Sequence, residues 1–238
     1  MCATYSIGLD FGTLSARAML VDNATGAASG ISVFEYPHGV IDRRLPGGGP
    51  ALPDGYALQD PGDYAQALEY LLSDVWRRAG VNPADIAGIG VAFTSCTMIP
   101  LDGGLRPLCY DSRYSDNPHA WTMLWKHHGA QAQADRITRL AARRGERFMD
   151  RYGGKCSSEW MLPRLLNILE EAPEVCAATH RFAEAGDWIV YLLTGALLRN
   201  SCSAGYKAFW SESEEVPSRA FYDALNPGLA DVIAEKVG

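Results

Sequence analysis

The sequence predicts an α/β domain built on a mixed β-sheet, and three observations lead to this fold class. The first 36 residues read as three short strands separated by tight turns, which is typical of an antiparallel meander. A helical stripe and then another strand follow between residues 61 and 93, as in units that add a parallel strand to a sheet. Helical patterns dominate from residue 117 onward, so we expect helices to flank the sheet.

The rest of the chain is organised around residues 7–21, which predict a strand, a tight turn at Gly12 and a second strand running back. Asp10 is the only charge in the first leg, and it falls where the strand runs out into the turn. We expect its carboxylate to be poorly hydrated there. A third strand over residues 28–36 completes the meander.

This hairpin carries residue types that suit a phosphate site. A carboxylate beside the open N–H groups of a turn can hold Mg²⁺ bound to phosphates, usually through water. Gly12 has no Cβ and lets a ligand approach the backbone, and Thr13 adds a hydroxyl donor. The same pattern is typical of a plain turn in which the aspartate caps its own backbone, so the hairpin alone leaves both interpretations open. It is neither a Walker loop nor a dinucleotide fingerprint.

Between the meander and the next strand lies a Gly- and Pro-rich segment, residues 37–61. Its composition predicts a surface loop, although a loop of this length is also often functional. Asp60 and Pro61 predict the start of a helix that continues to about Ala79.

Residues 86–93 contain no charge, which predicts a strand covered on both faces. Small polar residues follow its carboxyl end, among them Ser95 and Cys96. In open α/β sheets ligands bind at that edge. Cys96 has no base near it in the sequence, so we expect an inert thiol and no nucleophile.

The second half of the chain is expected to be mainly helical. Asn117 and Pro118 predict the start of a long helix that ends near Gly145, and Ser158 is expected to cap the next helix. The remaining predicted elements are helices over residues 173–178 and 187–193, a strand over 181–185 and a short amphipathic helix after 226–228. This order matches a ribonuclease-H-like, actin-like core.

Two further features allow a sugar site. Trp121 and Trp125 are four residues apart and would share one face of the predicted helix, either as core or as an aromatic floor for a sugar. Lys207 follows Tyr206 and precedes Phe209, so it is either a solvated lysine or a partly enclosed donor to a sugar hydroxyl or carbonyl.

Other candidate sites are weaker. His127 and His128 are adjacent, so on a helix their rings would point about 100° apart, and no carboxylate completes a zinc set. Residues 152–158 could bind phosphate, but a glycine turn with a helix cap at Ser158 is the favoured interpretation. No Ser-His-Asp or Cys-His set has local support.

Bulk properties narrow the functional classes. The chain has 238 residues, with 21 Lys and Arg against 28 Asp and Glu, a net charge of −7. This acidity argues against a nucleic-acid or anionic-membrane surface. The six cysteines form no C-x-x-C pair and no signal peptide precedes them, so we expect reduced thiols and a cytoplasmic protein.

Several of these stretches together resemble the FGGY carbohydrate kinase family, and within it the ribulokinase-like members. The matching segments occur in order along nearly the whole chain: residues 8–17, 93–100, 119–131, 152–160, 184–188 and 203–207. The Asp-Phe-Gly-Thr hairpin is shared widely by sugar kinases. The Leu-Trp-Lys-His-His and Thr-Ser-Cys-Thr-Met segments are more specific to ribulokinase-like members.

The resemblance implies an activity and a set of roles. An ATP-dependent kinase of arabinose catabolism would transfer the γ-phosphoryl group to the terminal hydroxyl of a ketopentose, L-ribulose above all. Asp10, Gly12 and Thr13 would face the ATP phosphates, with Asp10 holding Mg²⁺ through water. Ser95, Cys96, Trp125 and Lys207 would contact the sugar. A non-catalytic sugar-binding module and a kinase for xylulose or a related ketose remain as alternatives.

The resemblance also implies that something is missing. Family members are about twice as long, and their catalytic aspartate and main nucleotide-binding glycines belong to a second domain. We find no counterpart of that domain's Asp-Ala-His segment within residues 1–238, so we expect a sugar-side N-terminal domain with no catalytic base, inactive by itself. Its own C-terminal domain would be its partner. The oligomeric state stays open, with a homodimer among the options.

Overall fold

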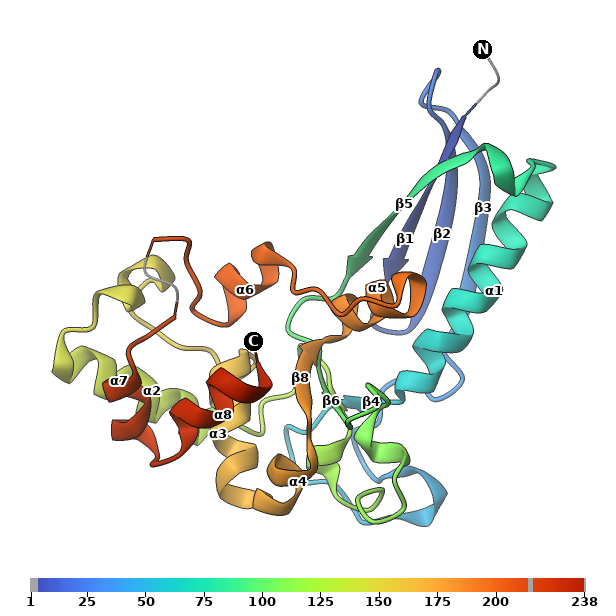
Figure 1. The fold of residues 1–238 in the computed structure, drawn as a ribbon. Coiled ribbons are helices and arrows are strands. Elements are labelled where there is room, and N and C mark those ends of the chain that lie inside the picture. Colours follow the sequence, from blue (N-terminus) through green and yellow to red (C-terminus); the bar gives the residue numbers. More distant parts are fainter. Residues whose placement is uncertain (1–3, 214–215, 238) are drawn as a thin grey trace.

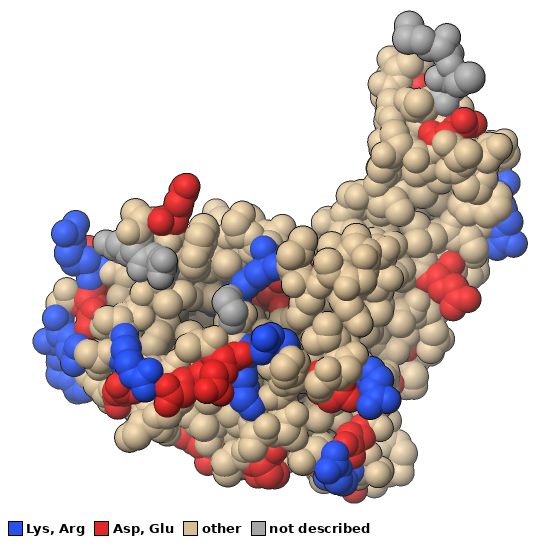
Figure 2. Space-filling model, viewed as in Figure 1, with Lys and Arg blue, Asp and Glu red and all other residues tan. Residues whose placement is uncertain are grey.

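The structure is a computed structural model that describes residues 4–213 and 216–237. A four-stranded sheet forms an arm that projects from a broader body, which holds a second small sheet and most of the helices (Figure 1). On the face drawn in Figure 2, basic and acidic side chains are interspersed over the body and form no patch of one sign. The predicted α/β class with a mixed sheet is confirmed.

The arm contains the predicted meander. Its strands are β1 (Tyr5–Phe11), β2 (Ser15–Asp22), β3 (Ala28–Glu35) and β5 (Ile86–Phe93), in the order β3-β2-β1-β5. The pairs β1–β2 and β2–β3 are antiparallel, whereas β5 runs parallel to β1. The parallel pair places the end of β1 beside the end of β5, with Phe11 opposite Phe93.

One face of this sheet is covered by α1 (Pro61–Ala79) and α5 (Ala185–Thr194). Alternate residues of β1, namely Ile7, Leu9 and Phe11, are buried against this layer because successive side chains of a strand point to opposite faces. The start of α1 is as predicted, since the Asp60 carboxylate accepts a hydrogen bond from the N–H of Gly62 at 2.8 Å.

The opposite face is open in the described part of the chain. Large apolar side chains are exposed there, such as Ile31 on β3 at 60% and Met19 on β2 at 44%. The expectation that residues 86–93 are covered on both faces is therefore wrong, because β5 is an edge strand whose small residues Gly88 and Gly90 are exposed. Half of the residues in this uncharged run are glycine or alanine, which occur on exposed as well as on buried strands. The absence of charge therefore does not indicate burial of both faces.

The second sheet joins segments that are far apart in the sequence. Its strands are β4 (Leu58–Gln59), β7 (Thr122–Met123), β6 (Met98–Leu101) and β8 (Arg181–Glu184), in that order and all antiparallel. The Gly- and Pro-rich segment 37–61 contributes β4 and buries Ile41 and Tyr56. It is thus not a surface loop throughout.

The predicted long helix from Asn117 is wrong in its first half. Asn117 caps a single 3-10 turn, Pro118–Ala120, and the chain then enters β7 before α2 (Gln131–Arg144) begins. Pairing with β4 overrides the helical pattern, since Met123 pairs with Leu58 in the sheet. As a result Trp121 is buried while Trp125 is 44% exposed, and they do not share a helix face.

The later elements mostly follow the sequence. The structure has α3 (Met161–Glu171), α4 (Pro173–Ala178), β8, α5 and α8 (Leu229–Lys236) where elements were predicted, whereas α6 (Ser201–Lys207) and α7 (Arg219–Leu225) were not predicted. Ser158 does not cap α3, because Trp160 is the N-cap residue and makes no side-chain cap bond. The Ser158 hydroxyl is instead hydrogen-bonded to Nδ1 of His128 at 3.0 Å.

Two general features complete the fold. In residues 4–213 and 216–237, the helices are too short or too polar to cross a lipid bilayer. Five cysteines lie in this part of the chain and are free thiols, four of them buried and Cys202 exposed, while Cys2 lies outside the described residues.

Candidate functional site

A cleft of about 340 Å³ lies between the carboxyl end of β5 and the end of α6. Its volume is within the range typical of small-molecule sites. Six residues line it: Thr94, Ser95, Cys96, Trp125, Glu159 and Lys207. The structure therefore brings together the four residues that the sequence predicts for the sugar, although they come from three distant segments.

The turn after β5 forms the floor of this cleft. Cys96 adopts a left-handed backbone conformation with φ of 62°, which is uncommon for a residue with a Cβ. Neighbouring groups hold it there: the Thr97 hydroxyl donates to the Thr94 carbonyl at 2.7 Å, and the Thr97 N–H donates to the carboxylate of Glu184 at 3.2 Å. Non-glycine residues in this conformation are kept only where their surroundings determine it, as they do here.

The Cys96 side chain is buried, and burial raises the pKa of its thiol. A raised pKa keeps sulfur in the weakly nucleophilic thiol form at neutral pH. The thiol therefore gives the floor shape and does not supply a nucleophile.

Trp125 forms one wall of the cleft and connects it to the first hairpin. The indole Nε1–H donates a hydrogen bond to the Thr13 hydroxyl at 3.1 Å. The ring is 44% exposed, so part of its apolar surface is available to a ligand. Of the two interpretations of the tryptophan pair, Trp121 is core and Trp125 has the geometry of an aromatic sugar surface.

Lys207 is the last residue of α6 and reaches the cleft between aromatic rings. Its Nζ lies 5.9 Å from the ring centroids of both Trp160 and Tyr206. These distances fit cation–π contacts, which help to hold the ammonium group at the cleft. The enclosed lysine is thus the alternative that the geometry favours.

Glu159 is the cleft residue that the sequence reasoning missed. It stands two residues before α3, and its carboxylate shares the cleft with Lys207. Nothing local marks it, because its partner in the cleft is far along the chain. A carboxylate and an ammonium group that line one cleft are complementary towards sugar hydroxyls, because the carboxylate accepts hydrogen bonds and the ammonium group donates them.

The predicted phosphate hairpin lies next to this cleft. The N–H of Gly12 donates to the Ser15 carbonyl at 2.9 Å, and a Cβ at Gly12 would lie 3.1 Å from that same oxygen. A side chain here would therefore fit only if the hairpin backbone moved by a few tenths of an ångström. The Thr13 carbonyl accepts a hydrogen bond from the Gln59 side chain at 2.6 Å, which anchors the tip of the hairpin.

Asp10 is less enclosed than expected. Its side chain is 58% exposed and lies 3.4 Å from the guanidinium of Arg17, so the prediction of a poorly hydrated carboxylate is wrong. The reason is that Asp10 points to the open face of the sheet. Arg17 gives this face a cation beside the anion, which a phosphate group can use.

The metal chemistry of the hairpin can be tested against its donors. In the part of the chain that the structure describes, no group of three His, Cys, Asp or Glu side chains could enclose a metal ion. Mg²⁺ in kinases is commonly held by one or two carboxylates, substrate phosphates and water. Asp10 and Thr13 therefore fit a magnesium ion that is held mainly by the phosphates of a ligand and by water.

The neighbouring histidines have a packing role. His127 is fully buried, and its Nδ1 accepts a hydrogen bond from the N–H of Ala57 at 3.2 Å. Burial, together with the nearby Arg164 charge, lowers its pKa well below the usual value, so the ring is neutral.

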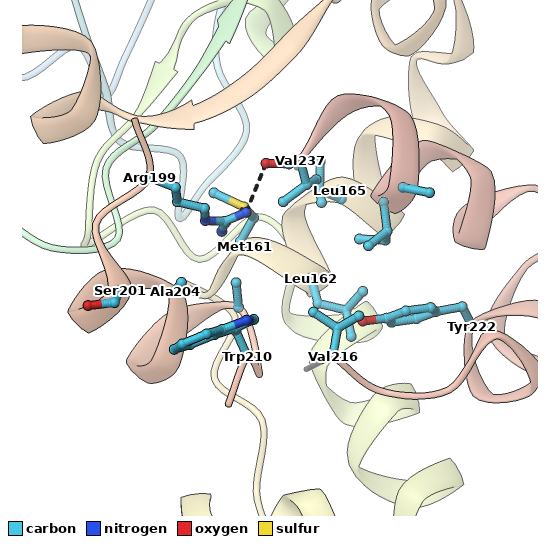
Figure 3. Close-up of a pocket in the computed structure, with 13 residues that line it drawn as sticks. Met161, Leu162, Leu165, Arg199, Ser201, Ala204, Trp210, Val216, Tyr222 and Val237 are labelled. Carbon is cyan, nitrogen blue, oxygen red and sulfur yellow. Dashed lines mark hydrogen bonds between the residues drawn. The ribbon is translucent and has the colours of Figure 1, made fainter. Parts of the chain in front are cut away.

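A second cavity, of about 280 Å³, lies between α3, α6 and the C-terminal helices (Figure 3). It shares no lining residue with the cleft, and most of its wall is apolar, for example Leu162, Leu165 and Ala204. Arg199 closes one end by donating to the Val237 carbonyl at 3.0 Å. Because this cavity offers few polar partners to hydroxyl groups, the cleft suits the sugar that the family resemblance implies better than this cavity does.

Comparisons with known proteins show which sequences and folds this chain resembles. The sequence profile described as "FGGY family of carbohydrate kinases, N-terminal domain" matches residues 5–211. The chain is 46% identical over 233 residues to a ribulokinase of Geobacillus thermodenitrificans, covering 98% of the chain and 41% of that protein. It is 48% identical over 234 residues to a ribulokinase of Mycolicibacterium smegmatis, covering 98% of the chain and 41% of that protein.

Solved structures give the same architecture. The crystal structure of xylulose kinase from Rhodospirillum rubrum superimposes with a TM-score of 0.72 at 19% identity, covering 97% of the chain and 41% of that structure. At this identity the likeness shows the fold alone. The chain spans about two fifths of the length of these proteins.

Proposed function

Since this chain belongs to the FGGY family of carbohydrate kinases and matches the N-terminal domain of that family, we propose that it supplies the sugar pocket of an ATP-dependent ribulokinase. The reaction transfers the γ-phosphoryl group of ATP to the terminal hydroxyl of L-ribulose and yields L-ribulose 5-phosphate. One observation carries the proposal: Ser95, Cys96, Trp125 and Lys207 line a single cleft, and Trp125 is hydrogen-bonded to the phosphate hairpin.

The cleft holds and orients the ketopentose. The exposed indole surface of Trp125 packs against the C–H face of the sugar, and the floor at Ser95 and Cys96 offers backbone groups. Lys207 donates to a hydroxyl or the carbonyl, and Glu159 accepts from hydroxyls. Such positioning is what phosphoryl transfer chiefly requires of a protein.

The hairpin receives the phosphates. Gly12 would let them approach the backbone, Thr13 would donate a hydrogen bond, and Asp10 would hold Mg²⁺ through water. When bound, Mg²⁺ neutralises charge on the transferring phosphoryl group. The hydrogen bond from Trp125 to Thr13 keeps the sugar wall and the phosphate hairpin side by side.

The remaining parts belong to a second domain in this proposal. That C-terminal domain supplies the carboxylate that takes the proton of the sugar hydroxyl, and most of the nucleotide site. The length of the relatives supports it, because the chain covers only 41% of them. We place the kinase in the cytoplasm, where ATP and reduced thiols are available.

A coupled ADP-release assay on the complete protein tests the proposal. L-ribulose is expected to give the highest kcat/KM in a panel that includes D-xylulose and gluconate, and residues 1–238 alone are expected to show no turnover. A clear preference for another sugar would contradict the assignment of L-ribulose as the substrate. Sugar-dependent turnover by residues 1–238 alone would contradict the proposal that a second domain supplies the catalytic base.

Calorimetric titration of residues 1–238 with L-ribulose separates the other class of function. Weak binding that tightens in the complete protein with ATP fits a kinase domain. Tight binding without ATP or a second domain would favour a sugar-binding module.

A further inference from the structure

Arg164 is the largest fully buried side chain of the described chain, and it is cationic. It stands on α3, with 0% of its surface exposed. Its guanidinium donates to four main-chain carbonyls: Nη1 to Cys96 at 2.5 Å and Met123 at 3.0 Å, and Nη2 to Leu124 at 2.6 Å and His127 at 3.4 Å. No carboxylate is hydrogen-bonded to it in the described residues. Its positive charge is therefore stabilised by the dipoles of these main-chain carbonyls.

These carbonyls belong to the two segments that form the cleft. Cys96 is in the floor, and Leu124 directly precedes Trp125 in the wall. The two segments are not paired as strands at these residues, since β6 and β7 meet only at Met98 and Met123. Arg164 is therefore a direct bridge between the floor and the wall.

The geometry needs a planar fork with several donors. Buried carbonyl groups without a partner are costly, and one guanidinium with five fixed N–H donors can serve both segments at once. A lysine at this position would present a single point charge and could not span the same acceptors.

The floor is held from its other side by an acid. Glu184 is buried on β8, and its carboxylate accepts the N–H of Thr97, the residue after Cys96. The Cys96–Thr97 peptide thus lies between a buried cation on its carbonyl side and a buried carboxyl on its N–H side. This arrangement accounts for the unusual backbone of Cys96.

We infer that Arg164 is the positioning residue of the sugar pocket: it fixes the separation between the Cys96 floor and the Trp125 wall without touching the sugar. The inference rests on the proposed function for the identity of the sugar, but not for the bridge itself. Sub-ångström changes in this separation alter the fit of the ketopentose and its alignment with the phosphates.

The first experiment compares Arg164→Lys with Arg136→Lys in the complete protein. Arg136 is the matched control, because its guanidinium also pairs with a residue of α3, Glu170, but lines no part of the cleft. Arg164→Lys is expected to raise KM for L-ribulose by about tenfold or more with a smaller fall in kcat, and KM for ATP is expected to stay unchanged. Arg136→Lys should leave all three constants unchanged. A folded Arg164→Lys protein with wild-type KM for the sugar would overturn the inference.

Amide hydrogen exchange supplies a readout that needs no sugar. The N–H groups of Thr97 and His127 report on the floor and the wall, since each is hydrogen-bonded in the structure. In the wild-type protein we expect the two amides to exchange with opening constants within about tenfold of each other, because one side chain closes both segments. Widely different opening constants would contradict the shared bridge, even if no variant folds.

The two measurements also separate this inference from the proposed function. If the wild-type protein phosphorylates no ketopentose, the proposed function fails. The exchange experiment still decides whether Arg164 joins the two segments. If the wild type is active on L-ribulose, but Arg164→Lys leaves the sugar KM unchanged or the two wild-type opening constants differ widely, only the inference fails.

Discussion

The floor of the sugar cleft and the phosphate hairpin are neighbours, but they are built in opposite ways. At the floor, the backbone around Cys96 and Thr97 is held by buried Arg164 and Glu184. At the hairpin, the Asp10 carboxylate is 58% exposed and its partner Arg17 is exposed as well. The hairpin is joined to the floor by the hydrogen bond from the Thr94 N–H to the Phe11 carbonyl at 3.0 Å, and to the wall by the hydrogen bond from the Trp125 indole to the Thr13 hydroxyl at 3.1 Å.

This difference indicates which of the two proposed sites, the sugar cleft or the phosphate hairpin, is fully formed before a ligand binds. Shape selection for a sugar needs rigid walls, and buried hydrogen bonds supply them. A phosphate and magnesium site needs open coordination positions that the nucleotide and water fill. In the proposed kinase, the chain thus prepares the sugar side and leaves the phosphate side to be completed when ATP binds.

The largest effect is expected from a substitution in the exposed phosphate hairpin. Asp10→Asn in the complete protein should lower kcat by about 10²–10³-fold, because the carboxylate that orients the Mg²⁺ shell loses its charge. Its unfolding free energy should change by less than about 0.5 kcal/mol, since the side chain is exposed. Steady-state kinetics and urea unfolding measure both quantities. Glu69→Gln, the same kind of change at an exposed position of α1, is the control. Undiminished kcat in Asp10→Asn would remove this residue from the mechanism.

At the floor, the buried carboxyl group of Glu184 should make the unfolding free energy depend on pH. Burial raises the pKa of Glu184 to about 7, although the Arg164 charge opposes part of the shift. The folded state therefore binds this proton more tightly than the unfolded state, and the resulting stabilisation is present below about pH 4.5 and lost as the pH rises through 7. Glu184→Gln cannot titrate. Between pH 5 and pH 8, the unfolding free energy of the wild type should fall by about 2 kcal/mol relative to the variant. Parallel pH profiles for the two proteins would show that Glu184 keeps an ordinary pKa.

Two substitutions test the role of Trp125, which lines the cleft and is hydrogen-bonded to the phosphate hairpin. Trp125→Ala should raise KM for the sugar by about tenfold with little change in kcat, because uniform binding surface is lost. Trp125→Phe keeps an apolar ring but removes the Nε1–H donor to Thr13, so it should restore most of the sugar KM. Steady-state kinetics of the two variants separate the contribution of the Trp125 ring to sugar binding from that of its hydrogen bond to Thr13. A KM unchanged in Trp125→Ala would assign this indole to packing alone.

The smallest expected effect sharpens the description of the cleft. Glu159→Gln keeps the size of the side chain but exchanges a charged acceptor for a neutral amide, and should raise KM for L-ribulose by about threefold. The effect should be absent for KM of ATP. A lower sugar KM would mean that Glu159 repels the substrate or competes with it for Lys207.

Local chemistry made several parts of this fold predictable. The three-strand meander, the Asp60 cap of α1 and the strand that ends at the sugar floor depend on neighbouring residues, and all three are confirmed. Two of the wrong predictions share one cause. The helix expected from Asn117 gives way to β7, and Ser158 turns to His128, because partners distant in sequence outcompete local preferences.

By itself, the sequence determined the α/β class, the order of the motifs and four residues that line the cleft, since these follow from short-range patterns and their resemblance to a family. Only the tertiary structure decided that Trp121 is core while Trp125 faces the cleft, that Glu159 joins it, and that Arg164 bridges its two segments. The physical reason is that a buried hydrogen bond or a shared cavity depends on distances between segments, and such distances are set by the packing of the whole chain.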